Sequence, residues 1–302
     1  LSIHPEPEFK AVFTNLGSTA AGGPSSIGSH YTGQDHDGQV TVSSGIQLWT
    51  VPYTGEYRIE AIGGAGWYGK NSVVQNGGRG AKLTGNFILT KDEIIRILVG
   101  HKGKRGPGSQ TTTGGGGGTF VVRGSNTPLI IAGGGGGIKN MSEQHSGCDA
   151  SISTTGNAGY SSSLGSGGTG GNGGGYGKEL FLASIEVIGG VCSWIHLINN
   201  DEEELICYGK TVSGGVQGEG GKGYLQGGEG GAYLGGFGGG GGFRGGDNGA
   251  GGGGGYSGGN GGGNKAFFCG GGGGSFNIWT NQLNECCYNC DERDKVIITF
   301  LQ

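Results

Sequence analysis

Glycine sets the strongest limit on how this chain can fold: it accounts for 81 of the 302 residues. Because glycine loses the most backbone entropy on folding and has no side chain to bury, the chain needs a source of stability besides hydrophobic packing. A disordered Gly-rich linker would be poor in aromatic residues, whereas this chain has 11 Phe, 11 Tyr and 4 Trp. Collagen is excluded because no Gly-X-Y period is sustained and only 6 prolines are present. We therefore expect glycine to serve the close packing of backbones.

The N-terminal third has the pattern of an antiparallel β-sandwich. Residues 56–62 (EYRIEAI) place Tyr57, Ile59 and Ala61 on one face and charged residues on the other, as a strand with one face in a core and one in water requires. Turn signals such as the 52–55 segment (PYTG) separate similar runs. The predicted strands are residues 9–14, 39–43, 46–51, 56–62, 82–89 and 93–99.

From Gly114 onward the pattern changes to runs of five glycines, at residues 114–118, 133–137, 238–242, 251–255 and 270–274. Strand-like segments, residues 119–123 (TFVVR) and 128–132 (PLIIA), lie between the first of them. A bundle of polyproline II helices makes such a glycine density useful, because each helix has no internal hydrogen bonds and bonds instead to its neighbours. Aromatic residues are expected to pack at the margins of this bundle, rather than to stack on a ligand. They are Tyr176, Tyr224, Tyr233, Phe237, Phe243 and Tyr256.

These patterns divide the chain into an N-terminal arm, a discontinuous sandwich and a large insertion. The predicted boundaries are 1–8 for the arm, 9–113 and 276–302 for the sandwich, and 114–275 for the glycine-rich insertion, which includes a β-hairpin near 187–210. Both chain ends are expected in the sheets, through residues 9–14 and 295–301.

Charge and hydropathy exclude two classes of function. The net charge of -4 and the pI near 5.9 disfavour nucleic-acid binding, which needs clustered Lys and Arg. No run of about 18 apolar residues is present, so no membrane span is expected. The chain opens at Leu1, which is compatible with a removed signal peptide and equally with a truncated chain.

Seven cysteines favour an extracellular, disulfide-bonded protein. Cys286, Cys287 and Cys290 form a cluster (CCYNC), and Cys148, Cys192, Cys207 and Cys269 are dispersed. Zinc is the alternative for the Cys287–Cys290 pair, but a second pair of similar spacing is lacking. The sequon that begins at Asn140 is a weak glycosylation signal in keeping with the same compartment.

One disulfide follows from hairpin register. If Asn199 and Asn200 form a two-residue turn, Cys192 and Cys207 face each other across the hairpin, at a Cα separation of about 4.5–5.5 Å that a disulfide spans. Seven cysteines cannot all pair within one chain, so one is free or joined to another molecule.

Residues 235–260 (GGFGGGGGFRGGDNGAGGGGGYSGGN) and the flank at 45–69 resemble the glycine-rich region of the anaplastic lymphoma kinase and leukocyte tyrosine kinase receptors. The resemblance implies a sandwich like that of tumour necrosis factor and an inserted bundle of polyproline II helices. Kinase, membrane and EGF-like segments of those receptors are missing from this sequence. No ligand-binding residue can be transferred residue by residue.

Catalytic constellations are scarce, so we expect no enzyme activity and no cofactor or metal. The strongest metal candidate is Asp35-His36-Asp37, whose carboxylates suit calcium but lack further oxygen ligands at the right spacing; a solvated turn is the preferred interpretation. Phosphate loops are mimicked by chance in such Gly-rich sequence, and no GK[ST] motif precedes a helix.

Three functions remain. The first is a non-enzymatic extracellular structural protein that assembles with copies of itself into a filament, coat or matrix, with the 1–8 arm or the CCYNC cluster at a head-to-tail junction. The second is an extracellular recognition module that binds a protein ligand through the sandwich. The third, an ice-binding surface, is weakened by the lack of regular Thr or Ala spacing.

Overall fold

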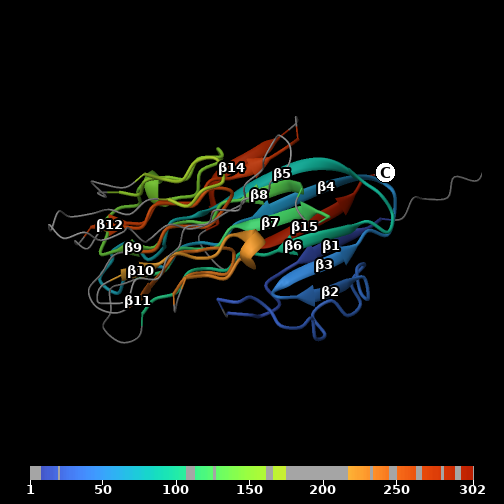
Figure 1. Cartoon of the computed structure of the whole chain (residues 1–302), viewed down its shortest axis with the longest axis horizontal. Coiled ribbons are helices and arrows are strands. Elements are labelled where there is room, and N and C mark those ends of the chain that lie inside the picture. The colour runs from blue at the N-terminus through green and yellow to red at the C-terminus, as the bar shows by residue number, and fades with distance from the viewer. Residues whose placement is uncertain are drawn as a thin grey trace, which may run out of the picture.

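The chain is mainly β, with two antiparallel sheets at one end of its long axis and glycine-rich segments at the other (Figure 1). The computed structural model describes residues 8–19, 21–106, 113–124, 127–160, 166–174, 217–231, 234–244, 250–262, 267–279, 282–289 and 294–301. Within these residues the helical elements are two short 3-10 turns, η1 (Ser146–Cys148) and η2 (Tyr224–Gln226). The predicted fold class, antiparallel β, is confirmed.

The five-stranded sheet contains the first and the last strand of the described residues. Its order is β1 (Lys10–Phe13), β15 (Lys295–Phe300), β4 (Gly55–Ile62), β5 (Gly80–Leu89) and β14 (Leu283–Asn289). β1 and β15 pair antiparallel, with Ala11 opposite Ile298. The prediction that both ends lie in the sheets is therefore confirmed. β14 was not predicted as a strand; it includes Cys286 and Cys287, which the sequence assigned to a cysteine cluster ahead of the last strand.

The six-stranded sheet has the order β13 (Phe276–Asn277), β8 (Thr127–Ala132), β7 (Thr119–Arg123), β6 (Ile94–Leu98), β3 (Ile46–Thr50) and β2 (Val40–Ser43). β7 pairs with β6, and β8 pairs with β7. These two strands lie within the predicted insertion, so the change of composition at Gly114 does not separate sandwich from glycine-rich part. The apolar, β-branched runs TFVVR and PLIIA follow strand preference even between glycine runs.

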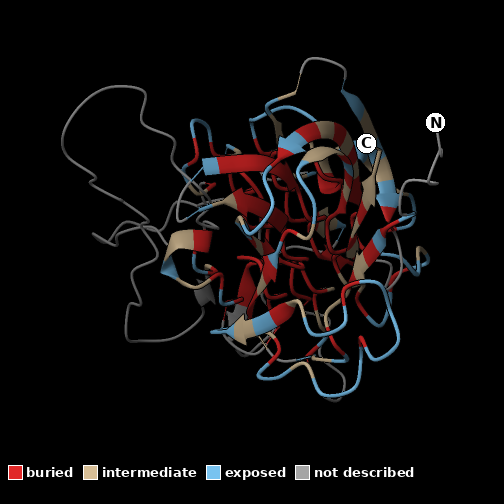
Figure 2. Cartoon of the chain, turned by 90° about the vertical axis from the view of Figure 1, so that its right-hand side faces the viewer, coloured by how far each residue is buried: buried red, intermediate tan, exposed pale blue. Residues whose placement is uncertain are grey.

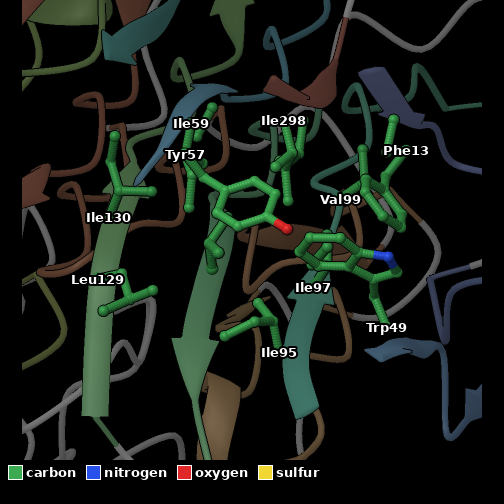
Figure 3. Close-up of a cluster of buried hydrophobic side chains, with 14 of the residues drawn as sticks. Phe13, Trp49, Tyr57, Ile59, Ile95, Ile97, Val99, Leu129, Ile130 and Ile298 are labelled. Carbon is green, nitrogen blue, oxygen red and sulfur yellow. The ribbon is translucent and has the colours of Figure 1, made fainter. Parts of the chain in front are cut away.

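One hydrophobic core lies between the two sheets, as in a β-sandwich. It contains the inward side chains of both sheets, which are every second residue along a strand. Examples are Tyr57 and Ile59 from β4 and Ile95 and Ile97 from β6, all fully buried (Figure 3). Trp49 of β3 packs edge-on against Tyr57, with ring centroids 5.9 Å apart. Viewed along the long axis, buried residues occupy the interior, and exposed residues lie mostly at the periphery (Figure 2).

We call residues 114–118 and the described residues of 133–275 the glycine-rich part. It is held by hydrogen bonds between backbone segments that lie outside the two main sheets. Two short strand pairs, β9 (Ile138–Lys139) with β12 (Phe268–Cys269) and β10 (Gln217–Glu219) with β11 (Gly242–Arg244), lie at its end (Figure 1). In residues 114–118, N–H groups three residues apart donate to the same neighbouring segment. Gly114 and Gly117 donate to the carbonyls of Lys104 and His101, Gly115 and Gly118 to those of Gly241 and Gly238, and Gly116 to that of Gly135. Residues 114–118 are thus bonded to three neighbouring segments.

These segments approach so closely that a side chain has no room. A methyl group added at Gly117 would overlap the carbonyl oxygen of Phe237, and one at Gly136 would overlap that of Gly270. In both cases the overlapping atom belongs to backbone, which cannot turn aside as a flexible side chain can. The glycines of the runs are therefore required by packing.

A second apolar cluster joins the two parts. Leu98, Phe120 and Val122 on the outer face of the six-stranded sheet pack with Tyr224 and Phe237 of the glycine-rich part. Tyr256 belongs to the same cluster and stacks on Phe276, with ring centroids 5.0 Å apart. The aromatic residues predicted at the margins of the glycine-rich part thus include three that cover a sheet. Tyr176 and Tyr233 lie outside the described residues.

Candidate recognition surface

The outer face of the five-stranded sheet is the open face of the sandwich. On β4 and β5, buried residues alternate with half-buried or exposed ones, so Arg58 and Ile88 point away from the core. The register places Arg58 opposite Asn86 and Glu56 opposite Ile88. We use the name open face for the part of this surface formed by the outward positions of β4, β5 and β14. These are Glu56, Arg58, Glu60, Lys82, Thr84, Asn86, Ile88, Leu283, Glu285 and Tyr288.

Charged groups on the open face form ion pairs around Lys82. The Lys82 ammonium lies 3.5 Å from a Glu60 oxygen and 3.4 Å from a Glu285 oxygen. It also lies 4.9 Å from the centre of the Tyr288 ring, which is a cation–π contact. Partial burial lowers the pKa of Lys82, but the Glu285 and Glu60 carboxylates outweigh it and raise the pKa above its ordinary value. Lys82 therefore stays charged at neutral pH.

Exposed apolar side chains accompany these charges. Ile88 and Leu283 are each 58% exposed and Tyr288 is 40% exposed. Exposed aliphatic and aromatic groups are typical of the centre of a protein interface, and charged groups are typical of its rim. The outer face of the six-stranded sheet differs, because the second apolar cluster covers it.

The two carboxylates of the Asp35-His36-Asp37 segment bond to backbone N–H groups. The Asp35 carboxylate accepts a hydrogen bond from the Lys10 N–H (2.7 Å), and the Asp37 carboxylate accepts one from the Gly33 N–H (3.0 Å). Among the described residues no group of three or more metal-ligating side chains occurs. The two carboxylates are exposed, as a solvated turn requires, but His36 between them is fully buried. The solvated-turn interpretation is therefore right for the aspartates and wrong for His36.

Four of the seven cysteines lie in the described residues, and they form two disulfides. Cys148 bonds to Cys269, across 121 residues, and Cys286 bonds to its neighbour Cys287. Cys192, Cys207 and Cys290 lie outside the described residues, as does the predicted 187–210 hairpin, so its disulfide stays a prediction. Cys287, at φ 64°, lies where the pairing of β14 with β5 shifts register.

Asn140 directly follows β9 and has a left-handed backbone, with φ of 51°. Asn tolerates this conformation better than most residues. Its side chain is half-buried, and its glycosylation stays a prediction.

The open face was not singled out by the sequence, although its signal was present. The alternation in residues 56–62 predicts that Glu56, Arg58 and Glu60 face water. The alternation does not predict that β14 pairs with β5. This pairing brings Glu285 and Tyr288 to Lys82 from about 200 residues away in sequence.

No family model matches the chain. A stretch of 100 residues is 36% identical to the leukocyte tyrosine kinase receptor of Mus musculus, and this stretch covers 31% of the chain and 11% of the receptor. The similarity supports a distant relationship to this receptor family. The matched region is about a tenth of the receptor's length, so the activity and partners of the whole receptor are not transferred. In the described part of the chain, no helix is long and apolar enough to cross a membrane.

Proposed function

We propose that this chain is a non-enzymatic extracellular recognition module that binds a protein ligand through the open face. The observation that carries the proposal is the difference between the two outer faces: one is covered by the glycine-rich part, and the other presents exposed apolar groups beside ordered charges. The partial similarity to a receptor points the same way. Disulfides and the absence of a described membrane helix are compatible with an extracellular location.

The proposal includes the finer architecture. The three-residue repeat of hydrogen-bond donors in residues 114–118 supports polyproline II helices, which have three residues per turn and no internal hydrogen bonds. The two packed antiparallel sheets, with glycine-rich segments inserted between their strands, suit the tumour-necrosis-factor-like sandwich of the receptor family.

The alternative, a self-assembling structural protein, gains no support from the described residues. Residues 1–7 of the predicted arm and Cys290 of the predicted junction lie outside them. Light scattering coupled to size-exclusion chromatography separates the two functions, because the recognition module should elute as a 30.2 kDa monomer. Large polymers at micromolar concentration would instead favour the structural protein.

Binding is tested with the purified chain as probe on an array of purified extracellular proteins. The variant Glu56→Ala/Ile88→Ala removes one cross-strand pair from the open face. Its matched control, Thr50→Ala/Ile94→Ala, removes an exposed cross-strand pair from the other sheet. We expect a bound protein to lose at least about tenfold in affinity with the first variant, roughly 1.4 kcal/mol, and to be retained by the second. Equal retention by both variants would contradict recognition through the open face.

A further inference from the structure

The connection from β1 to β2 covers an edge of the sandwich and is tied to both sheets. Asp35 holds it to β1 through the Lys10 N–H, in the five-stranded sheet. Gln39 holds it to β3 of the six-stranded sheet, since its side-chain oxygen accepts from the Trp49 indole N–H (3.1 Å) and its carbonyl accepts from the Thr50 N–H (3.0 Å). The Gln39 amide also donates to the Asp35 carbonyl (2.9 Å) and so joins the two ties. We call residues 27–39 the latch loop.

His36 is the buried residue between these two ties. Its side chain is 0% exposed, and its ring lies 4.3 Å from the Tyr31 ring and 4.9 Å from the Phe13 ring, centroid to centroid. Neither ring nitrogen has a hydrogen-bond partner. A neutral imidazole has one donor and one acceptor, and a charged one has two donors. This pocket satisfies neither form, and the charged form is the more costly to bury.

The groups around His36 do not compensate for a buried charge. The Asp35 and Asp37 carboxylates flank it in sequence, but both are exposed and already accept backbone N–H groups. The Tyr31 hydroxyl is held by the Thr14 N–H and by Gln47, and burial raises the pKa of Tyr31 to about 12, so this phenol stays neutral. Phe13 offers only its ring. Burial accordingly lowers the pKa of His36 below its ordinary value of 6.5, and the two carboxylates offset this only in part.

We propose that the latch loop is an acid-released latch, in which protonation of His36 expels its ring from the Phe13–Tyr31 pocket and frees the Asp35 tie to β1. The sign follows from linkage: with the pKa lowered in the folded state, the closed loop is fully stabilised above pH 6.5 and loses that stability as the pH falls below it. β1 is an edge strand of the sheet that carries the open face. Its release in acid would loosen that sheet, and release of a bound partner in acid is a consequence that rests on the proposed function.

Hydrogen exchange of the chain alone tests the latch and needs no ligand. Peptides that cover residues 9–14 and 31–39 are followed by mass spectrometry at about pH 7.5 and pH 5.5, with rates corrected for intrinsic pH dependence. We expect corrected exchange to rise by up to about tenfold per pH unit, the limit for coupling to one proton. His36→Phe keeps the ring packing and both aspartates but cannot be protonated, so its exchange should not rise. His30→Gln, an exposed histidine of the same loop, should behave as the wild type.

An equal rise in wild type and His36→Phe would overturn the proposal. If His36→Phe does not fold, nuclear magnetic resonance of the wild-type ring decides the matter, because His36 should titrate below pH 6.5 together with loss of the Lys10 amide protection. A ring that takes up its proton while that protection persists would also overturn it. Failure to find a protein ligand would leave these results unaffected, so the two proposals fail separately.

Discussion

The sandwich and the glycine-rich part obey opposite packing rules within one chain. The sandwich core consists of large side chains, such as Trp49 and Tyr57, that interdigitate between two sheets. The glycine-rich part has backbones in contact where a side chain would lie, with carbonyl oxygens filling the place of a Cβ at Gly117 and Gly136. The sandwich is stabilised by buried side chains, and the glycine-rich part depends on the lack of Cβ atoms at its glycines. The difference gives each region its own sensitive mutation: truncation for the sandwich and addition of one methyl group for the glycine-rich part.

Truncation of the sandwich core should have the largest effect. Trp49 is fully buried and contacts Phe9, Phe13 and Tyr57. Trp49→Ala should lower the free energy of unfolding by about 3–5 kcal/mol, from lost burial and the cavity left behind. Denaturant unfolding measures this, and Thr50→Ala, at the exposed neighbouring position, is the near-neutral control. A loss below about 1 kcal/mol would show that side-chain packing does not dominate the sandwich.

Removal of the Cys148–Cys269 disulfide should have an intermediate effect, confined to the glycine-rich part. The bond joins residues 121 positions apart in sequence, and both cysteines lie in a small buried apolar cluster with Ile138 and Met141. Cys148→Ser/Cys269→Ser should lower the free energy of unfolding by about 2–5 kcal/mol. Hydrogen exchange should show faster opening of residues 133–150 and 267–274, while β4 and β5 keep their protection. Equal loss of protection in β4 and β5 would mean that the two regions unfold as one unit and would break the comparison.

Loss of a charge on the open face should have the smallest effect. Lys82→Met removes the ammonium between Glu60 and Glu285 but keeps an apolar stem near Tyr288. Ion pairs near a protein surface contribute little, so we expect a change of about 1 kcal/mol or less in the free energy of unfolding. Thermal unfolding at low and high salt checks this. A loss comparable to that of Trp49→Ala would mean that these charges serve the fold and are not free for recognition.

The sequence predicts the sandwich well because strands obey a local rule. The period of two in residues 56–62, and the apolar runs at 46–51 and 93–99, each correspond to an observed strand. β14 was missed because LNECCYN is polar and cysteine-rich, and it becomes a strand only by pairing with β5 at the sheet edge. The boundary at Gly114 failed for a related reason, since composition changes there while sheet pairing continues through β7 and β8.

The candidate sites were less predictable than the fold. Burial of His36 depends on Phe13 and Tyr31, which lie 23 and 5 residues away in sequence, so an exposed turn was the natural interpretation of Asp35-His36-Asp37. The Lys82 contacts likewise join β4, β5 and β14. Glycine runs, by contrast, predict close backbone packing directly. Their sequence does not predict which segments are neighbours.

The most direct test of these opposite packing rules is a pair of Gly→Ala substitutions. At Gly117 a methyl group meets the Phe237 carbonyl, whereas at Gly22 no atom lies within 4 Å of it and the backbone does not have a positive φ. Gly117→Ala should lower the free energy of unfolding by at least about 1–3 kcal/mol, the cost of overpacking. Gly22→Ala should be neutral or slightly stabilising, because it restricts only the unfolded chain. Equal unfolding free energies for the two variants would contradict the claim that the glycine-rich part is held by backbone contact.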